Sequence, residues 1–134
     1  MLVSIIIPYY KDKKNIFYSV KSAINQSYRN TEILIIDDEN SNKSKRHLSN
    51  IKNTSSKIKV ISTKKNLGVS QARNLGASHA LGNLIAFLDS DDIWKKDKLA
   101  IQVDFMNKNK IDLCYTNYYA FADKKIIYKV KIKK

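Results

Sequence analysis

The chain of 134 residues has a single cysteine, a single proline and three glycines. With one thiol, Cys114, no internal disulfide can form, and its place in the apolar run 111–115 predicts a small buried residue in a reducing compartment. No apolar run approaches the length that spans a bilayer, and the start Met-Leu-Val-Ser lacks the basic segment of a signal peptide. We therefore expect one cytoplasmic domain over residues 1–134, because this length supports one core and not two.

Acidic residues are also scarce. The chain has 12 Asp plus Glu against 25 Lys plus Arg, which gives a formal net charge of +13. Such a surplus attracts nucleic acid, phosphorylated substrates or an anionic membrane surface, and charge alone does not distinguish among them. In the Lys-rich segment 124–134 the lysines alternate with apolar residues, which favours an amphipathic edge strand over a nucleic-acid motif.

Predicted strands alternate with predicted helices along the chain. Continuous β-branched runs are typical of strands buried on both faces, and apolar residues at helical spacing predict the helices between them. The expected strands are 2–7, which Pro8 stops, 33–36, 58–62 and 84–88. One expected helix begins near Asn15, a polar helix with Leu48 and Ile51 follows the turn and capping residues 40–44, and two more helices cover 69–81 and 98–109. Residues 113–121 and 126–132 predict a hairpin about Asp123-Lys124. This order predicts an α/β, Rossmann-like fold with a mainly parallel sheet flanked by helices and a C-terminal hairpin.

The most informative segment is 87–92, Phe-Leu-Asp-Ser-Asp-Asp, where a predicted strand runs into three carboxylates. Asp89, Asp91 and Asp92 would repel one another without a counter-ion. Oxygen ligands of this kind suit Mg²⁺ or Mn²⁺, which usually also bind a substrate diphosphate. The alternative is that Asp91 or Asp92 caps the next helix. Three carboxylates within four residues favour the metal interpretation.

Other unusual residues also follow predicted strands. Ligands of parallel sheets bind beyond the carboxyl ends of the strands, so these residues are expected to share one crevice. They are Pro8-Tyr9-Tyr10, Asp37-Asp38 and Lys64-Lys65-Asn66. Neighbouring residues of a strand point to opposite sides. We therefore interpret Asp37 as a helix cap or a partner for a lysine, while for Asp38 this role and a contact with a base or ribose are equally supported.

The segment 66–76 adds a glycine and an arginine to this crevice. Gly68 allows a close turn into a helix whose N-terminus favours anions. Arg73, one turn into that helix, can present a planar charged group to a base or phosphate. Gly76 and Ala77 are equally well explained by close packing of the helix on the sheet.

Four segments resemble, in this order, the N-terminal half of glycosyltransferase family 2. They are Val-Ser-Ile-Ile-Ile-Pro-Tyr-Tyr (3–10), Glu-Ile-Leu-Ile-Ile-Asp-Asp (32–38), Asn-Leu-Gly through Ala-Arg-Asn-Leu-Gly (66–76) and Phe-Leu-Asp-Ser-Asp-Asp (87–92). The resemblance implies a truncated A-type glycosyltransferase fold that binds a nucleotide sugar. It assigns to the nucleotide-sugar site the residues Pro8, Tyr10, Asp38, Gly68, Arg73, Asp89 and Ser90. Within that set it implies that Asp38 binds the base, and that Asp91, with Asp89 beside it, holds Mn²⁺ or Mg²⁺.

The same resemblance implies an activity. The expected reaction is inverting transfer of a sugar from a nucleoside diphosphate, preferably UDP, to a glycan or lipid-linked acceptor in bacterial surface glycan synthesis. The acceptor site and catalytic base of the family lie in a C-terminal half that we expect this chain to lack, so the catalytic base is unassigned and the chain alone is expected to have weak or no activity. Two departures affect the base-binding loop, because Lys11 replaces the usual Asn and Glu39-Asn40 replaces Gly-Ser.

The expected binding partners of the chain follow from its positive net charge and from the expected absence of a C-terminal half. A basic surface predicts peripheral contact with the anionic inner face of a membrane, and exposed apolar surface on a half-domain predicts a homo-oligomer. A phospho-receiver domain is disfavoured because its acidic pair follows the first strand, where this chain has Pro8-Tyr9-Tyr10. A non-catalytic nucleotide-binding domain or a basic nucleic-acid-binding domain is the remaining alternative. The chain lacks a recognition helix and an aromatic RNA-binding strand motif, so we expect no nucleic-acid partner.

Overall fold

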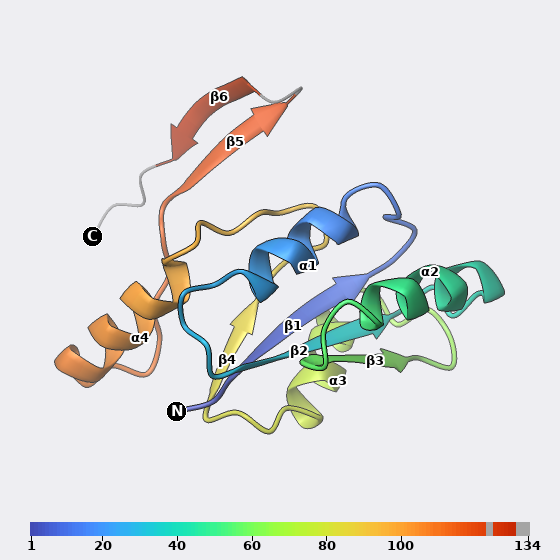
Figure 1. Cartoon of the computed structure of the whole chain (residues 1–134), viewed down its shortest axis with the longest axis horizontal. Coiled ribbons are helices and arrows are strands. Elements are labelled where there is room, and N and C mark those ends of the chain that lie inside the picture. Colours follow the sequence, from blue (N-terminus) through green and yellow to red (C-terminus); the bar gives the residue numbers. More distant parts are fainter. Residues whose placement is uncertain (123–124, 131–134) are drawn as a thin grey trace. The chain divides into compact units, whose positions relative to one another are not determined.

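The computed structural model describes residues 1–122 and 125–130 and divides into two compact units, Met1–Leu99 and Ala100–Lys134. The first unit is a four-stranded parallel sheet in the order β3-β2-β1-β4 with helices on both faces (Figure 1). Its elements are β1 (Val3–Tyr9), α1 (Ile16–Ile24), β2 (Thr31–Asp37), α2 (Asn42–Lys52), β3 (Ile58–Ser62), α3 (Val69–Ser78) and β4 (Leu84–Phe87). The predicted α/β class with a mainly parallel sheet is confirmed.

The connections place α1 and α2 on one face of the sheet and α3 on the other. From β1 the chain moves outward to β2 and β3 and then crosses back to β4, and right-handed crossovers in opposite directions lie on opposite faces (Figure 1). Side chains alternate accordingly. On the α3 side, Ile6, Leu34 and Ile36 pack with Ala72. On the other side, the Tyr9 ring lies 6.4 Å from the His47 ring of α2.

The prediction that Pro8 stops the first strand is wrong. β1 continues through Pro8 to Tyr9, and Pro8 is in register with Ile36 of β2. The backbone groups of Pro8, like those of Ile6 two residues earlier, are directed toward β4 and away from β2, but pairing with β4 ends at Ile6. The missing N–H of Pro8 therefore falls where the strand has no neighbour to receive it, and the ladder with β2 loses nothing.

Close packing of α3 depends on Gly76. A Cβ added there would lie 2.5 Å from Cγ2 of Ile6, a fully buried residue of β1. We expect Gly76→Ala to destabilise the protein by about 1 kcal/mol, since overpacking of about 1–3 kcal/mol is partly offset by about 1 kcal/mol of helix propensity. Urea denaturation measures the change. Asn74→Ala, at an exposed position of the same helix, is the control and should be neutral or stabilising; equal stability of the two variants would contradict the packing argument.

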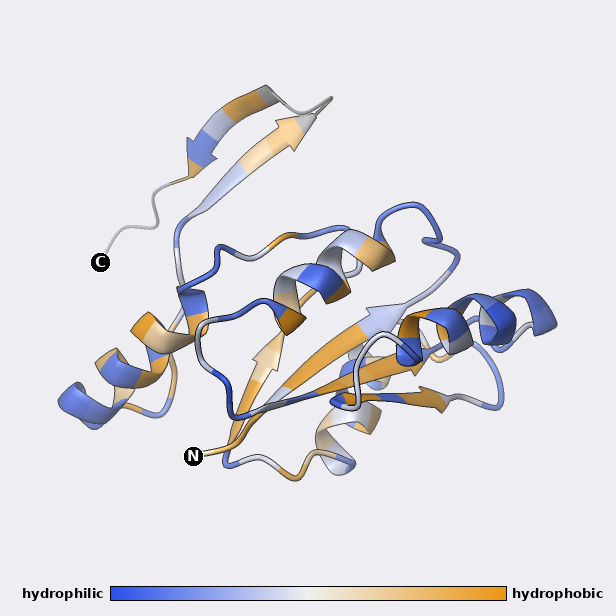
Figure 2. Cartoon of the chain, in the orientation of Figure 1, coloured by the Kyte–Doolittle hydropathy of each residue, from blue (hydrophilic) through white to orange (hydrophobic). Residues whose placement is uncertain are grey.

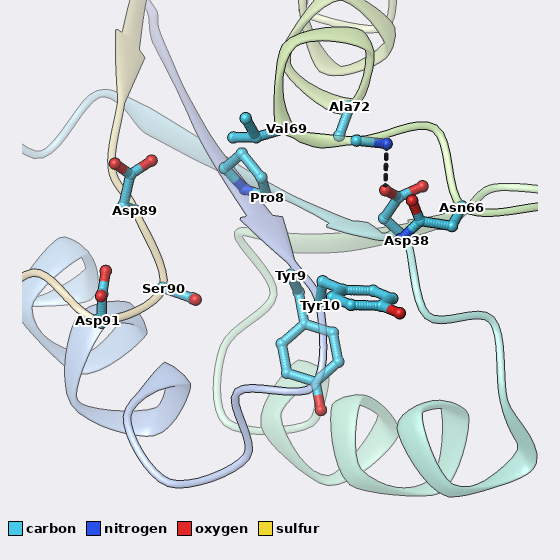
Figure 3. A pocket seen from close by; sticks show the side chains of 11 residues that line it. Pro8, Tyr9, Tyr10, Asp38, Asn66, Val69, Ala72, Asp89, Ser90 and Asp91 are labelled. Carbon is cyan, nitrogen blue, oxygen red and sulfur yellow. Dashed lines mark hydrogen bonds between the residues drawn. The ribbon is translucent and has the colours of Figure 1, made fainter.

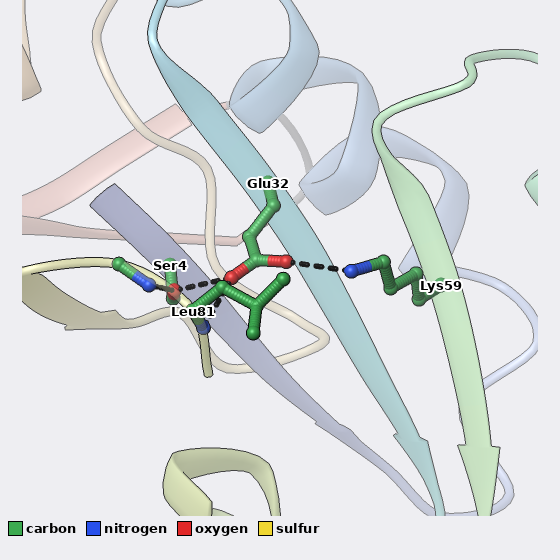
Figure 4. Close-up of polar contacts among 5 residues, drawn as sticks. Ser4, Glu32, Lys59 and Leu81 are labelled. Carbon is green, nitrogen blue, oxygen red and sulfur yellow. Dashed lines mark hydrogen bonds and ion pairs between the residues drawn. The ribbon is translucent and has the colours of Figure 1, made fainter. Parts of the chain in front are cut away.

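A buried carboxylate ties the strands together at the opposite end from the carboxyl edge (Figure 4). One oxygen of Glu32 accepts hydrogen bonds from the Ser4 hydroxyl and the Leu81 N–H, both at 2.7 Å, and the other accepts from Lys59 Nζ at 3.0 Å. Burial alone would raise the pKa of Glu32. The bonds from Ser4, Leu81 and Lys59 outweigh burial, so the pKa lies below its usual value.

This depressed pKa makes stability depend on acid. The contribution of ionised Glu32 is complete above the unfolded pKa, near 4.5, and is lost as the pH falls through the lower folded pKa. We expect Glu32→Gln to lower the free energy of unfolding by about 2 kcal/mol at neutral pH and to show a smaller deficit in acid. Denaturation midpoints from neutral to acid pH test this. A deficit that stays constant across the range would contradict it.

The second unit contains most of α4 (Lys98–Asn109) and the strands β5 (Tyr118–Ala122) and β6 (Lys125–Val130). These strands pair antiparallel, as the hairpin prediction requires, but β5 begins later than expected because residues 113–117 form no strand. The turn at Asp123-Lys124 and residues 131–134 lie outside the described residues. In the described ranges 1–122 and 125–130, no helix combines the length and apolar character needed to cross a membrane.

The prediction that Cys114 is a buried core residue is wrong. Cys114 is partly exposed, and its sulfur accepts a hydrogen bond from Gln102 Nε2 at 3.2 Å. Its neighbours Leu113 and Tyr115 are 80% and 67% exposed. The apolar run 111–115 forms an irregular segment whose residues are all partly or largely exposed.

Candidate functional site

A pocket of about 360 Å³ lies at the carboxyl edge of the sheet in the first unit (Figure 3). Its lining residues come from the ends of β1 and β2, the start of α3 and the turn after β4: Pro8, Tyr9, Tyr10, Asp38, Asn66, Gly68, Val69, Ala72, Asp89, Ser90 and Asp91. The residues that the family resemblance assigned to the nucleotide-sugar and metal sites all line this pocket except Arg73. The other residues expected at the crevice that do not line it are Asp37, Lys64, Lys65 and Asp92. The pocket therefore lies where parallel sheets bind their ligands, beyond the carboxyl ends of the strands.

Asp38 is buried at one side of the pocket and holds the loop before α3. One of its oxygens accepts hydrogen bonds from the Leu67 N–H at 2.8 Å and the Thr63 hydroxyl at 3.0 Å. The other accepts the Gly68 N–H at 2.9 Å (Figure 3). An ionised carboxylate has about four acceptor positions, so one remains for a ligand donor. The base-binding and capping interpretations of Asp38 are therefore compatible.

Asp37 faces the other side of the sheet and orders the turn into α2. One oxygen accepts the N–H groups of Glu39 and Asn40 at 3.2 and 3.1 Å, and the other accepts the Ser44 hydroxyl at 2.9 Å. Ser41 caps α2 through the Ser44 N–H. Asp37 does not line the pocket and has the local capping contacts expected from strand alternation.

Arg73 and Asp89 form an ion pair beside the pocket. Arg73 Nη2 donates to Asp89 Oδ1 at 2.5 Å, and the guanidinium carbon lies 5.8 Å from the Phe87 ring centroid. The Nε–H of Arg73 is buried without a hydrogen-bond partner among the described residues. Arg73 therefore neutralises Asp89 and retains a free donor.

The turn after β4 is held from α1 and from the loop that precedes it. The buried Ser19 hydroxyl lies 2.6 Å from the carbonyl oxygens of both Ser90 and Asp92. The Ser90 hydroxyl donates to Asp12 Oδ2 at 2.9 Å. These contacts join positions more than 70 residues apart, and no local pattern in the sequence identified Ser19 or Asp12 as supports of the site.

The acidic turn keeps one carboxylate without a protein partner. Asp91 is exposed, lines the pocket and makes no hydrogen bond or ion pair with the described residues. Asp92 is exposed as a residue, yet its carboxyl group is partly surrounded by protein. This partial burial and then the charges of Asp91 and Asp89 raise the pKa of Asp92 above its usual value. Negative charge is thus concentrated at this edge of the pocket.

The residues present fit a cation that is shared with a ligand. Across residues 1–122 and 125–130, no three His, Cys, Asp or Glu side chains are grouped so as to hold a metal ion. Mg²⁺ and Mn²⁺ sites that also bind nucleotides typically use one or two carboxylates and complete the coordination with phosphate oxygens and water. Asp91, with Asp89 as its neighbour, provides such a partial set.

Behind the pocket, Tyr9 turns its ring toward α2. The side chain is fully buried, and its hydroxyl has no hydrogen-bond partner among the described residues. Burial, and then the charges of Glu39, Asp37 and Asp12, raise the pKa of Tyr9 to about 12. The phenol therefore stays protonated at physiological pH.

A parallel sheet with a pocket at its carboxyl edge, lined by carboxylates and the start of a helix, is typical of nucleotide-binding α/β domains. The sequence matches the family described as Glycosyl transferase family 2 over residues 4–133. The chain belongs to glycosyltransferase family 2, as its motifs predicted.

Individual relatives agree with this assignment. The chain is 38% identical, over 94% of its length and 49% of the relative's, to the Escherichia coli UDP-Glc:alpha-D-GlcNAc-diphosphoundecaprenol beta-1,3-glucosyltransferase WfgD. It spans about half the length of WfgD and of some other curated relatives, and as little as 16% of the length of others. S. aureus TarS 1–349 in complex with UDP-GlcNAc is similar over 82% of this chain and 32% of that chain, with 26% identity and a TM-score of 0.73.

A second solved structure supports the fold. The mannosyltransferase PcManGT from Pyrobaculum calidifontis, in complex with GDP-Man and Mn2+, has a TM-score of 0.71 at 21% identity and covers 78% of this chain and 32% of that chain. The predicted A-type glycosyltransferase fold is confirmed.

Proposed function

We propose that residues 1–134 form the nucleotide-sugar-binding part of a transferase that uses a UDP-sugar and a divalent cation. The observation that carries this proposal is the pocket at the carboxyl edge, where Pro8, Tyr10, Asp38 and Asp91 come together from distant parts of the sequence. Their charges and shapes suit the successive parts of a nucleoside diphosphate. Family membership and the UDP-GlcNAc complex of TarS support a UDP-sugar as the ligand.

Each side chain has a defined role in this proposal. Pro8 and Tyr10 bound the nucleoside, Asp38 accepts a hydrogen bond from the base with its remaining lone pair, and Gly68 allows close approach to the start of α3. Arg73 lies beside the base, and its Nε–H, which is unpaired among the described residues, is the hydrogen-bond donor that it can offer there. Ser90 and Asp89 contact the ribose or the diphosphate. Asp91, with Asp89, holds Mn²⁺ or Mg²⁺, which would stabilise negative charge on the departing nucleoside diphosphate.

The reaction is transfer of the sugar to an acceptor hydroxyl with inversion. The bond from the anomeric carbon to the diphosphate breaks as the bond to the acceptor oxygen forms, and the acceptor proton passes to a base. We assign no residue of this chain as that base. The WfgD relative, named for a diphosphoundecaprenol-linked acceptor, supports a lipid-linked glycan as acceptor. We propose that the transfer to such an acceptor takes place at the cytoplasmic face of a membrane.

Calorimetric titration with UDP, GDP and ADP, each with and without Mn²⁺, tests the donor site. We expect UDP to bind more tightly than GDP or ADP, and Mn²⁺ to strengthen its binding. A folded sample that binds none of the three nucleotides would refute the assignment of the pocket. Tighter binding of GDP than of UDP would support the assignment of the pocket but would make guanine the preferred nucleobase.

A further inference from the structure

The side of the first unit that carries α1 has an aromatic and basic surface outside the pocket. Phe17 and Tyr18 are 46% and 58% exposed, and their rings meet edge to face with centroids 5.9 Å apart. Lys14 and Lys21 are also exposed. Phe17, Tyr18 and Lys21 have the spacing that groups side chains on one face of α1, and Lys14 lies in the turn just before that helix. We call these four residues the α1 stripe.

α2 lies on the same side of the sheet as α1 (Figure 1). A basic hollow borders the N-terminal half of α2. It has a volume of about 410 Å³ and is lined by Lys13, Asn42, Lys43, Arg46, His47 and Asn50. Desolvation and then the charge of Lys43 lower the pKa of Lys13, while Glu39 opposes this change. Two cations therefore lie close together at the mouth of the hollow. We call these six residues the α2 hollow.

Few carboxylates neutralise this side of the unit. α1 and α2 contain none, and no acidic residue occurs from Asn40 to Leu88; Figure 2 shows α2 as mostly hydrophilic. The nearby carboxylates have other contacts. Asp12 accepts hydrogen bonds from Asn15 and Ser90, and Glu39 accepts one from the Ser41 hydroxyl. Lys14 and Lys21 form no ion pair with the described residues.

We infer that the α1 stripe and the α2 hollow form one docking surface for an anionic lipid bilayer. Exposed aromatic rings flanked by lysines are typical of helices that lie in a membrane interface, where the rings enter the headgroup level and the cations meet lipid phosphates. An edge-to-face pair of rings offers no flat platform for stacked bases, so nucleic acid explains the stripe less well. The inference deepens the proposed function and rests on it for the membrane-bound acceptor.

Co-sedimentation with vesicles tests this surface. The probe is vesicles of equal parts phosphatidylglycerol and phosphatidylcholine, compared with vesicles of phosphatidylcholine alone. Lys14→Gln/Lys21→Gln should weaken partitioning to the anionic vesicles by about 25-fold, at about 5-fold per lysine. Phe17→Gln/Tyr18→Gln should weaken it by about tenfold. Lys64→Gln/Lys65→Gln, which removes the same charge from the exposed loop before α3, is the control and should change it by about twofold or less.

Each outcome decides the inference. Wild-type partitioning by both α1 variants, an equal loss in the Lys64/Lys65 control, or indifference to phosphatidylglycerol would overturn it. Tighter binding to single-stranded DNA than to the vesicles, lost in the same α1 variants, would assign the surface to nucleic acid instead. Circular dichroism verifies folding, and UDP titration of the same samples keeps the two proposals separate, because none of the substituted residues lines the nucleotide pocket.

Discussion

Asp91→Asn is expected to abolish the effect of Mn²⁺ on UDP binding and to weaken UDP binding in Mn²⁺ by about 100-fold or more, the upper end of the loss seen for residues that only support a metal ligand. The exposed Asp91 carboxylate has no partner among the described residues, so its replacement should not disturb the fold. Asp89 is neutralised by Arg73 and is a poorer substitute ligand. Calorimetry with UDP, with Mn²⁺ and with a chelator, measures both effects.

The matched control for this experiment is Asp92→Asn. It removes the same charge one position along the same turn, but Asp92 does not line the pocket. Its UDP affinity should keep its dependence on Mn²⁺. If both variants lose that dependence equally, the turn acts through its total negative charge, and a specific metal ligand at Asp91 is excluded. If neither loses it, the cation is held elsewhere.

Much of the scaffold was predictable because its signals are local. Residues 58–62 and 98–109 were predicted as a strand and a helix with the limits that the structure gives to β3 and α4. Pro8 was misread because the cost of proline in a strand depends on whether a neighbouring strand needs its N–H, and β4 ends too early to need it. The point at which β4 stops pairing is set by the register of the folded sheet, and the residues around Pro8 do not encode it.

The candidate site was predictable in its main residues and not in their supports. Strand ends in a parallel sheet converge by topology, so Asp38 and Asp91 share a pocket although they lie 53 positions apart in the sequence. The hydrogen bonds of Ser19 and Asp12 to the acidic turn require the folded loop to exist first. The pairing of Arg73 with Asp89 likewise joins two residues that sequence reasoning had placed separately in the site.

Asp38→Asn is expected to weaken UDP binding at least tenfold and to lower the free energy of unfolding by about 2 kcal/mol. The asparagine oxygen can still accept from Leu67 and Thr63, but the amide nitrogen then faces the Gly68 N–H, so two donors oppose each other in a buried site. The loop before α3 should loosen, and with it one wall of the pocket. Calorimetry with UDP and urea denaturation measure the two losses.

Asp37→Asn separates this effect from a general cost of removing a buried carboxylate. The asparagine oxygen keeps the Glu39 and Asn40 N–H groups, and its amide can donate to the Ser44 hydroxyl, which rotates to accept. UDP binding should therefore be nearly unchanged in Asp37→Asn. Equal losses of UDP affinity in the two variants would contradict the distinct roles that strand alternation gives to these neighbouring carboxylates, because only the side chain of Asp38 reaches the pocket.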